Sequence, residues 1–136
     1  MKPVAKNLRD VFSILKPDMS VDCIDVCPEL YPMLERNYSG FKDHALVAVH
    51  EFTNSWGSWE QHPAGDEIVV LLSGSAKMIL LVESIEESIE LNEPGSYVVV
   101  PSGVWHTARI SKPTKMLFIT PGEGTQHVDS PNDLSE

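Results

Sequence analysis

The most constraining feature of the sequence is a series of seven short apolar segments that begins after residue 41. The segments are rich in Val, Ile and Leu, and Gly, Pro and Ser recur between them. Short strand-like segments separated by turn residues at this spacing are typical of antiparallel sandwiches and barrels. The predicted strands cover residues 45–52, 67–72, 76–83, 87–91, 96–100, 105–110 and 115–120.

Two of these predicted strands are apolar on both faces. The runs IVVLL at 68–72 and YVVV at 97–100 lack the polar alternation of a strand with one side in water. We therefore expect their outer face to be covered, either by an N-terminal helix or by a second copy of the chain. The second alternative predicts a homodimer.

The first 40 residues predict a helical extension. Within 5–16, apolar residues follow the i, i+3, i+4, i+7 spacing of an amphipathic helix, and Pro17 ends it. A second helical piece is predicted within 28–38, where Pro28 suits a first-turn position and Pro32 would interrupt a long helix. The apolar residues of the first helix are Leu8, Val11, Phe12 and Leu15.

Domain organisation follows from these segments. A chain of 136 residues fits one domain. The expected parts are an N-terminal helical or strand extension over 1–40, a barrel over 41–121 and a C-terminal tail over 122–136. The tail is polar and rich in Gly and Pro, so we expect a loop and a frayed end.

The charge balance limits the classes of partner. Ten basic and 20 acidic residues give a net charge of −10, which repels nucleic acid and anionic lipid surfaces. No apolar run approaches the roughly 18 residues of a membrane span, and the N-terminus carries charges where a signal peptide needs apolar residues. We expect a cytoplasmic protein without nucleic-acid or membrane partners, whose two cysteines, Cys23 and Cys27, stay reduced.

A stretch before the second predicted strand gathers acidic and histidine side chains. It reads WEQHPAGDE over residues 59–67. Glu60 and His62 share one face if the segment is extended, and the Pro-Ala-Gly turn returns Glu67 towards the same side. His106 opens a later strand after a Pro-x-Gly turn and is a further candidate. The pattern indicates a metal site, with an inert polar cavity or a solvent-facing bend as the alternatives.

The stretches around His62 and His106 resemble the two motifs of the cupin superfamily. The first motif reads G-x5-H-x-H-x(3,4)-E-x6-G, and the second reads G-x5-P-x-G-x2-H-x3-N. The residues that fit the first motif are His62, Glu67 and Gly74. The residues that fit the second motif are Gly95, Pro101, Gly103 and His106. The resemblance covers about residues 41–121 and is more specific for fold than for function.

The sequence departs from these motifs at three positions. Glu60 stands at the place of the first histidine, and Ile110 stands at the place of the terminal asparagine. Asn54 occupies the place of the opening glycine, although Gly57 lies nearby. Where cupins of this kind hold a divalent metal with three histidines and a glutamate, this chain would offer two of each.

The resemblance implies an all-β fold, an antiparallel double-stranded β-helix of the jelly-roll type, with a metal site inside the barrel. His62, Glu67 and His106 then form a two-histidine, one-carboxylate set that suits Fe(II), and Mn, Ni or Zn could also bind there. Three roles are open for Glu60. It can be a fourth ligand, it can orient a histidine ligand, or it can act as a catalytic base over an open coordination position.

Two classes of function agree with this interpretation. The first is a small metal-dependent enzyme that acts on an organic small molecule, of the dioxygenase, isomerase or lyase type. The second is a non-catalytic binding or sensing protein that uses the same cavity without turnover. Trp59, Tyr97 and His50 are the candidates for the substrate pocket, with packing as the alternative for Trp59 and a structural role for His50.

Overall fold

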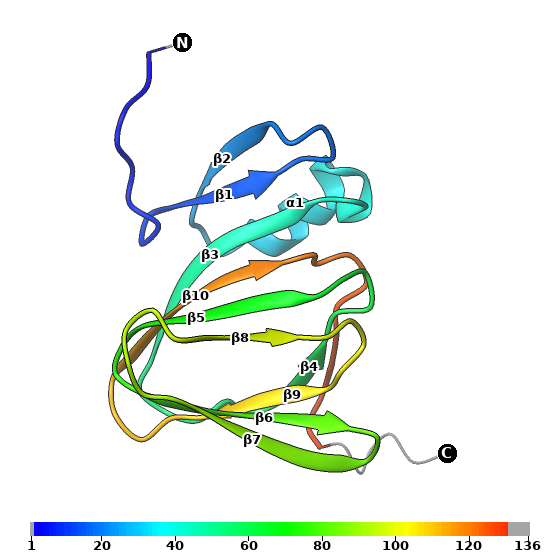
Figure 1. Ribbon diagram of the computed structural model, residues 1–136. Helices are drawn as coiled ribbons and strands as arrows, with labels where there is room; N and C mark the ends of the chain where they lie inside the picture. The colour runs from blue at the N-terminus through cyan, green and yellow to red at the C-terminus, as the bar shows by residue number, and fades with distance from the viewer. Residues whose placement is uncertain (1, 131–136) are drawn as a thin grey trace.

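The computed structural model describes residues 2–130, and residues 1 and 131–136 lie outside the described part. Eleven strands form two antiparallel sheets that face each other (Figure 1). The strands of the larger sheet are β1 (Val11–Leu15), β2 (Val21–Asp25), β3 (Ala45–Phe52), β5 (Glu67–Ser73), β8 (Tyr97–Val100) and β10 (Thr114–Thr120). The strands of the smaller sheet are β4 (Trp59–Gln61), β6 (Ala76–Val82), β7 (Ile85–Leu91), β9 (His106–Arg109) and β11 (Gln126–Val128).

The order of the strands is β2-β1-β3-β10-β5-β8 in the larger sheet and β11-β4-β9-β6-β7 in the smaller one. Consecutive strands often lie in opposite sheets, as β4 and β5 do, so the chain crosses repeatedly between the two layers. All seven strands predicted after residue 41 are present, each within two residues of its predicted ends. The predicted fold class, an antiparallel jelly-roll barrel, is confirmed.

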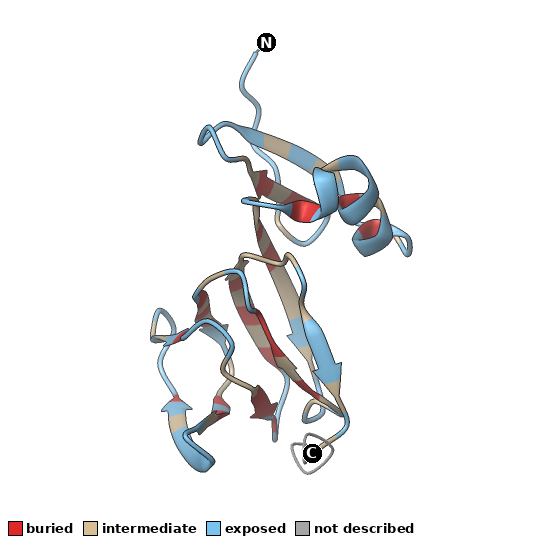
Figure 2. Ribbon diagram, turned by 90° about the vertical axis from the view of Figure 1, so that its right-hand side faces the viewer, coloured by how far each residue is buried: buried red, intermediate tan, exposed pale blue. Residues whose placement is uncertain are grey.

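Two apolar clusters stabilise the molecule. The larger cluster fills the space between the sheets and includes Val69, Met78 and Met116, each with no exposed surface. The smaller cluster joins the only α-helix among the described residues, α1 (Leu30–Asn37), to β1 and β3. Buried residues accordingly concentrate inside the barrel and beneath α1 (Figure 2).

The two N-terminal helix predictions have opposite outcomes. The helix predicted within 5–16 is wrong, because Val11–Leu15 forms β1 and pairs with both β2 and β3. The helix predicted within 28–38 is confirmed as α1, which a 3-10 turn over Ser39–Phe41 follows. Pro32 is tolerated because it lies in the first turn of α1, where backbone N–H groups have no partner within the helix.

The tail prediction is wrong in part. Residues Gln126–Val128 form β11 and pair with β4, so this segment is an edge strand of the smaller sheet. Residues 131–136 lie outside the described part of the chain. No helix among the described residues is long and apolar enough to span a membrane.

The outer face of the larger sheet carries apolar residues over four neighbouring strands, and an ion pair between Glu51 and Lys115 lies at one end of it, on β3 and β10. In one row Val49, Leu117, Val70 and Tyr97 lie side by side, and in the next row the neighbours are Val47, Ile119, Ile68 and Val99. The expectation that a helix covers this face is wrong. Instead α1 packs through Leu30 and Leu34 onto the opposite, inner face. The homodimer remains a prediction.

Candidate metal centre

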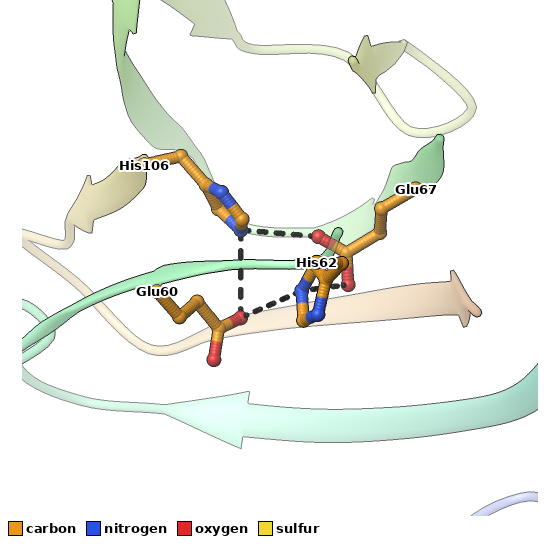
Figure 3. Close-up of side chains that lie close together, drawn as sticks. All are labelled: Glu60, His62, Glu67 and His106. Atoms are coloured by element: carbon orange, nitrogen blue, oxygen red, sulfur yellow. Dashed lines mark ion pairs between the residues drawn. The ribbon is translucent and has the colours of Figure 1, made fainter. Parts of the chain in front are cut away.

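Four side chains converge inside the barrel, and they come from three strands (Figure 3). Glu60 lies on β4, His62 follows β4, Glu67 begins β5 and His106 begins β9. One nitrogen or carboxylate oxygen from each side chain lies within 4.8 Å of the corresponding atoms of the other three. The structure therefore brings together all four residues that the sequence singled out as metal ligands.

The distances within this cluster are short. His106 Nε2 lies 3.1 Å from Glu67 Oε1 and 3.5 Å from Glu60 Oε1. His62 Nε2 lies 3.3 Å from Glu67 Oε2 and 3.5 Å from Glu60 Oε1. Each imidazole nitrogen thus faces both carboxylates around a common centre (Figure 3).

Strand pairing explains this convergence. Glu60 and His106 are directly opposite each other on the antiparallel strands β4 and β9, and His62 lies two residues after Glu60 on the same face. The turn before β9 is tied to the same region, because the Gly103 N–H donates to the His62 carbonyl oxygen at 3.0 Å. Gly103 has a φ of +77°, a conformation in which glycine is strongly favoured.

The four side chains differ in their access to solvent. His106 and Glu67 expose 0% and 2% of their side-chain surface, and His62 exposes 5%. Glu60 exposes 21%. The cluster is therefore reached from one side, and Glu60 is the member at that side.

Both imidazoles are oriented through their outer nitrogen atoms. His106 Nδ1 donates to the Val104 carbonyl oxygen at 3.0 Å. His62 Nδ1 lies 2.8 Å from Thr125 Oγ1, whose hydroxyl donates to the Gly122 carbonyl oxygen at 2.9 Å. The hydroxyl of Thr125 must therefore accept from His62. Because both Nδ1 atoms carry hydrogen, both Nε2 atoms can offer a lone pair to the centre.

Both carboxylates are oriented in the same way, through one oxygen. Thr120 Oγ1 donates to Glu67 Oε2 at 2.6 Å. His127 Nε2 lies 3.0 Å from Glu60 Oε2 and donates to it. Glu67 Oε1 and Glu60 Oε1 remain directed at the centre. Such outer hydrogen bonds are a regular feature of protein metal sites.

The atoms at the centre face one another at 3.1–3.5 Å, but the buried ones make no well-aligned hydrogen bond. His62 Nε2, His106 Nε2 and Glu67 Oε1 are buried, and none has a well-aligned partner among the described residues. Buried polar atoms in proteins are nearly always hydrogen-bonded, so three unpartnered atoms around one point need an explanation. Two imidazole nitrogens and two carboxylate oxygens form a donor set that suits a divalent transition metal, and the residues fit such an ion.

The ionisation of the cluster shows how strongly these groups interact. Burial acts to lower the pKa values of His62 and His106, but the adjacent Glu60 and Glu67 outweigh it and raise both values to about 9. Burial acts to raise the pKa values of Glu60 and Glu67, but the two imidazoles outweigh it and hold both values below the usual range. Without a metal, two protons therefore balance the two carboxylates at neutral pH.

A pocket of about 870 Å³ opens from this cluster towards α1. Glu60, His62 and Glu67 lie at one part of its wall, and Tyr31 and Leu34 of α1 line another part. The volume lies within the range of about 300–1,000 Å³ that small-molecule sites have. The arrangement can therefore admit an organic molecule next to the four side chains.

Two of the three residues predicted for the substrate pocket do not line it. His50 of β3 lines the pocket. Trp59 does not, because it neighbours Glu60 on β4 and its side chain is buried on the opposite face. Tyr97 does not either, because it lies on the outer face of the larger sheet with 62% of its surface exposed.

The sequence reasoning missed several residues of the site. Thr120, Thr125 and His127 hold the ligand side chains, but they follow the last predicted strand or end it, and no periodic signal marks them. Tyr31 lines the pocket as well. Trp56 was not missed: it flanks Gly57 just before the ligand-bearing strand, where the sequence suggested a tryptophan at the barrel mouth with packing as the alternative, and it lines the pocket.

Comparisons with known proteins identify the fold. No protein-family profile and no curated protein sequence matches the chain. Oxalate decarboxylase from Bacillus subtilis superposes with a TM-score of 0.51 at 20% identity, over 66% of this chain and 24% of that chain. A cupin-2 domain protein from Shewanella frigidimarina has a TM-score of 0.49 at 21% identity, over 57% and 70% of the two chains. A cupin superfamily protein from Desulfitobacterium hafniense has a TM-score of 0.48 at 24% identity, over 56% and 65%. The chain has the cupin fold.

Proposed function

We propose that this chain binds one divalent metal ion, Fe, Mn, Ni or Zn, and is a small metal-dependent enzyme that acts on an organic molecule. The ligands are His62, Glu67 and His106, and Glu60 is either a fourth ligand or a base beside the ion. One observation carries the proposal: ligand atoms of four side chains converge within 4.8 Å, the buried ones make no well-aligned hydrogen bond, and the outer atoms of the same side chains are hydrogen-bonded. The cupin fold agrees with a site inside a barrel, but fold alone does not assign a reaction.

The residues of the site divide the chemical tasks. A bound divalent ion would supply Lewis acidity to a substrate oxygen. The two carboxylates balance the charge of such an ion, and the two imidazoles contribute neutral nitrogen donors. Glu60 is the most exposed side chain of the cluster and lines the pocket, so an Oε1 that is not bound to the ion is the atom placed to take a proton from a substrate.

The alternative is a binding or sensing protein without turnover. The sensing alternative is favoured if Glu60 binds the ion through Oε1. Because Oε2 of Glu60 already accepts from His127, neither oxygen would then be free to act as a base. No further carboxylate belongs to the cluster among the described residues. A saturated ligand set would then leave the pocket without a base beside the metal.

Metal analysis tests the metal site, which the enzyme proposal and the sensing alternative both require. Protein purified without chelator should contain about one equivalent of metal, and His106→Ala should lose it. Glu67→Gln keeps the size of the side chain and should also lose metal if His106→Ala proves unstable. His44→Ala is the matched control, since His44 lies outside the cluster and contacts the Lys42 carbonyl oxygen. A metal-free wild type with unchanged stability in EDTA would overturn the proposal.

Turnover separates the enzyme from the sensor. The metal-loaded protein should be tested against a panel of organic molecules, starting with oxygen consumption and followed by product analysis. Catalysis that Glu60→Gln abolishes, with metal content retained, supports the base role of Glu60. Ligand binding without product across the panel supports the sensing alternative.

A further inference from the structure

The pocket wall beside the candidate metal centre is aromatic. The ring of Trp56 lies 6.1 Å from the ring of His106, centroid to centroid, and packs at 5.6 Å from Phe52 and 6.1 Å from Phe118. Of these rings, Trp56, Phe52 and Phe118 line the pocket. The indole N–H of Trp56 is buried and has no acceptor among the described residues. An aromatic wall, whose rings are inclined to one another by 40–82°, therefore adjoins one of the metal ligands.

The charges of the pocket disfavour an anionic ligand. Its described lining includes the carboxylates of Glu35, Glu60 and Glu67 but neither lysine nor arginine. Arg109, close in sequence to His106, is exposed and does not line the pocket. Glu60 and Glu67 already balance the charge of a divalent ion. A carboxylate or phosphate ligand would find no side-chain cation to offset its desolvation.

A neutral hydrogen-bonding pair joins α1 to β3 at the pocket wall. The hydroxyl of Tyr31 on α1 lies 3.1 Å from Nε2 of His50 on β3, and both residues line the pocket. Burial lowers the pKa of His50, so its imidazole is uncharged at neutral pH despite the opposing effect of Glu60. Burial, Glu60 and Glu67 together raise the pKa of Tyr31, so its hydroxyl is uncharged as well. The pair can therefore donate to or accept from a neutral hydroxyl group.

The size of the pocket sets a further limit. A cavity of about 150 Å³ is enough to hold one benzene ring. The pocket of about 870 Å³ has room for more than one ring.

We infer that the ligand of this pocket is an uncharged, hydroxylated aromatic molecule of more than one ring. Its rings pack against Trp56, Phe52 and Phe118, one hydroxyl would lie next to a bound metal ion, and the Tyr31–His50 pair binds a polar group at the other end. Tyr31 and His50 are thus residues of ligand specificity. The inference rests on the proposed metal site, and it adds the chemical class of the ligand.

Three matched probes test the ligand class on zinc-loaded protein at pH 7 under nitrogen, by titration calorimetry. They are naphthalene-2,3-diol, its saturated decahydro counterpart and naphthalene-2,3-dicarboxylate. The diol should bind about 2- to 12-fold more tightly than the decahydro compound, the factor for ~0.5–1.5 kcal/mol of aromatic contact. It should bind at least about tenfold more tightly than the dicarboxylate, whose charges are unpaired in the pocket.

Two tyrosine variants test the specificity contact. Tyr31→Phe removes the hydroxyl and should weaken diol binding by about 2- to 12-fold, the factor for a hydrogen bond of ~0.5–1.5 kcal/mol. Tyr97→Phe makes the same change on the outer face and should leave binding unchanged. Metal content should stay the same in both variants.

The outcomes separate this inference from the proposed function. If the protein takes up metal but binds the dicarboxylate or the saturated diol as well as the aromatic diol, the ligand class is wrong and the metal site stands. Unchanged affinity in Tyr31→Phe overturns the assigned contact. A protein that takes up no metal overturns the proposed function and this inference together.

Discussion

Glu60 is the residue at which the chain departs most clearly from the motif that it resembles, and its two oxygen atoms have different surroundings. Oε1 faces Nε2 of both His62 and His106 at 3.5 Å. Oε2 accepts from His127 at 3.0 Å, on the pocket side where Glu60 is partly exposed. The carboxylate is therefore held in the orientation of a ligand, although a histidine would usually occupy this place.

The contact between His127 and Glu60 gives a first prediction. His127→Ala should lower metal affinity by about tenfold, because loss of an outer hydrogen bond to a ligand typically costs 10- to 100-fold. Competition titration with a chromophoric chelator measures the change. His44→Ala, a histidine change outside the site, should have no effect, and equal affinities in the wild type and His127→Ala would contradict the prediction.

Metal ions and protons compete for His62 and His106, which gives a second prediction. Both pKa values are raised to about 9, so both imidazoles are protonated at pH 7 in the metal-free protein. A metal ion needs the deprotonated nitrogen, so uptake of one ion at pH 7 should release about two protons. Affinity should therefore rise as pH increases towards 9, by about 100-fold per pH unit when two protons are displaced.

Calorimetry in buffers with different ionisation enthalpies measures this proton release. The same titration at pH 10, where both imidazoles are already neutral, is the internal control and should release almost no protons. Release near zero at pH 7 would show that the two histidines are not the groups displaced.

The residues of the site differ in how far the sequence could predict them. His62, Glu67 and His106 belong to spaced motifs, and the pairing of Glu60 with His62 follows from strand alternation. Thr125 and His127 lie 63 and 67 residues from the side chains they contact. Only the pairing of β11 with β4 brings them there, and a single polar segment gives no sign of its pairing partner.

At the scale of elements, β1 shows how one pattern can satisfy two periodicities. Leu8, Val11, Phe12 and Leu15 match helical spacing, yet Phe12 and Ile14 are the residues that β1 buries, with 2% and 0% exposed. An alternation of two across a short segment is easily hidden within a helical pattern. Pairing with β2 and β3 decides the outcome. The two neighbouring strands bond to the backbone of β1 on both sides, whereas a short isolated helix is only marginally stable in water.

The turn between β5 and β6 gives a third prediction. Gly74 has a φ of +84°, and a Cβ atom there would overlap the backbone of Pro113 and Thr114. Gly74→Ala should lower the free energy of unfolding by ~2–4 kcal/mol, through backbone strain together with steric overlap. Gly57→Ala is the control, because no atom lies within 4 Å of the added Cβ. Chemical denaturation measures the free energy of unfolding of both variants. Equal denaturation midpoints for Gly74→Ala and Gly57→Ala would contradict the prediction.

At the scale of the whole molecule, the apolar outer face of the larger sheet gives a fourth prediction. Apolar side chains lie side by side across β3, β10, β5 and β8, and this surface can pair with the same surface of a second copy about a twofold axis. We expect a homodimer through this face. Val99 is 45% exposed there, so Val99→Lys should yield a folded monomer.

Light scattering coupled to size-exclusion chromatography measures the oligomeric state, and circular dichroism verifies the fold of the variant. Val82→Lys places the same charge on the smaller sheet, at a residue with 37% exposure, and should remain dimeric. A wild type that is monomeric at micromolar concentration would contradict the prediction.

The sequence indicated this apolar face through two strands that are apolar on both sides, but it could not show on which side of the larger sheet α1 packs.

The pairing of β11 with β4 also has a consequence for the time course of folding. The contacts from Thr125 and His127 to the ligand side chains close loops of more than 60 residues, and contacts over such separations form slowly. An ion bound by the four ligands would hold β4 and β9 together, and it would therefore also favour the docking of β11, the last of these strands in the chain.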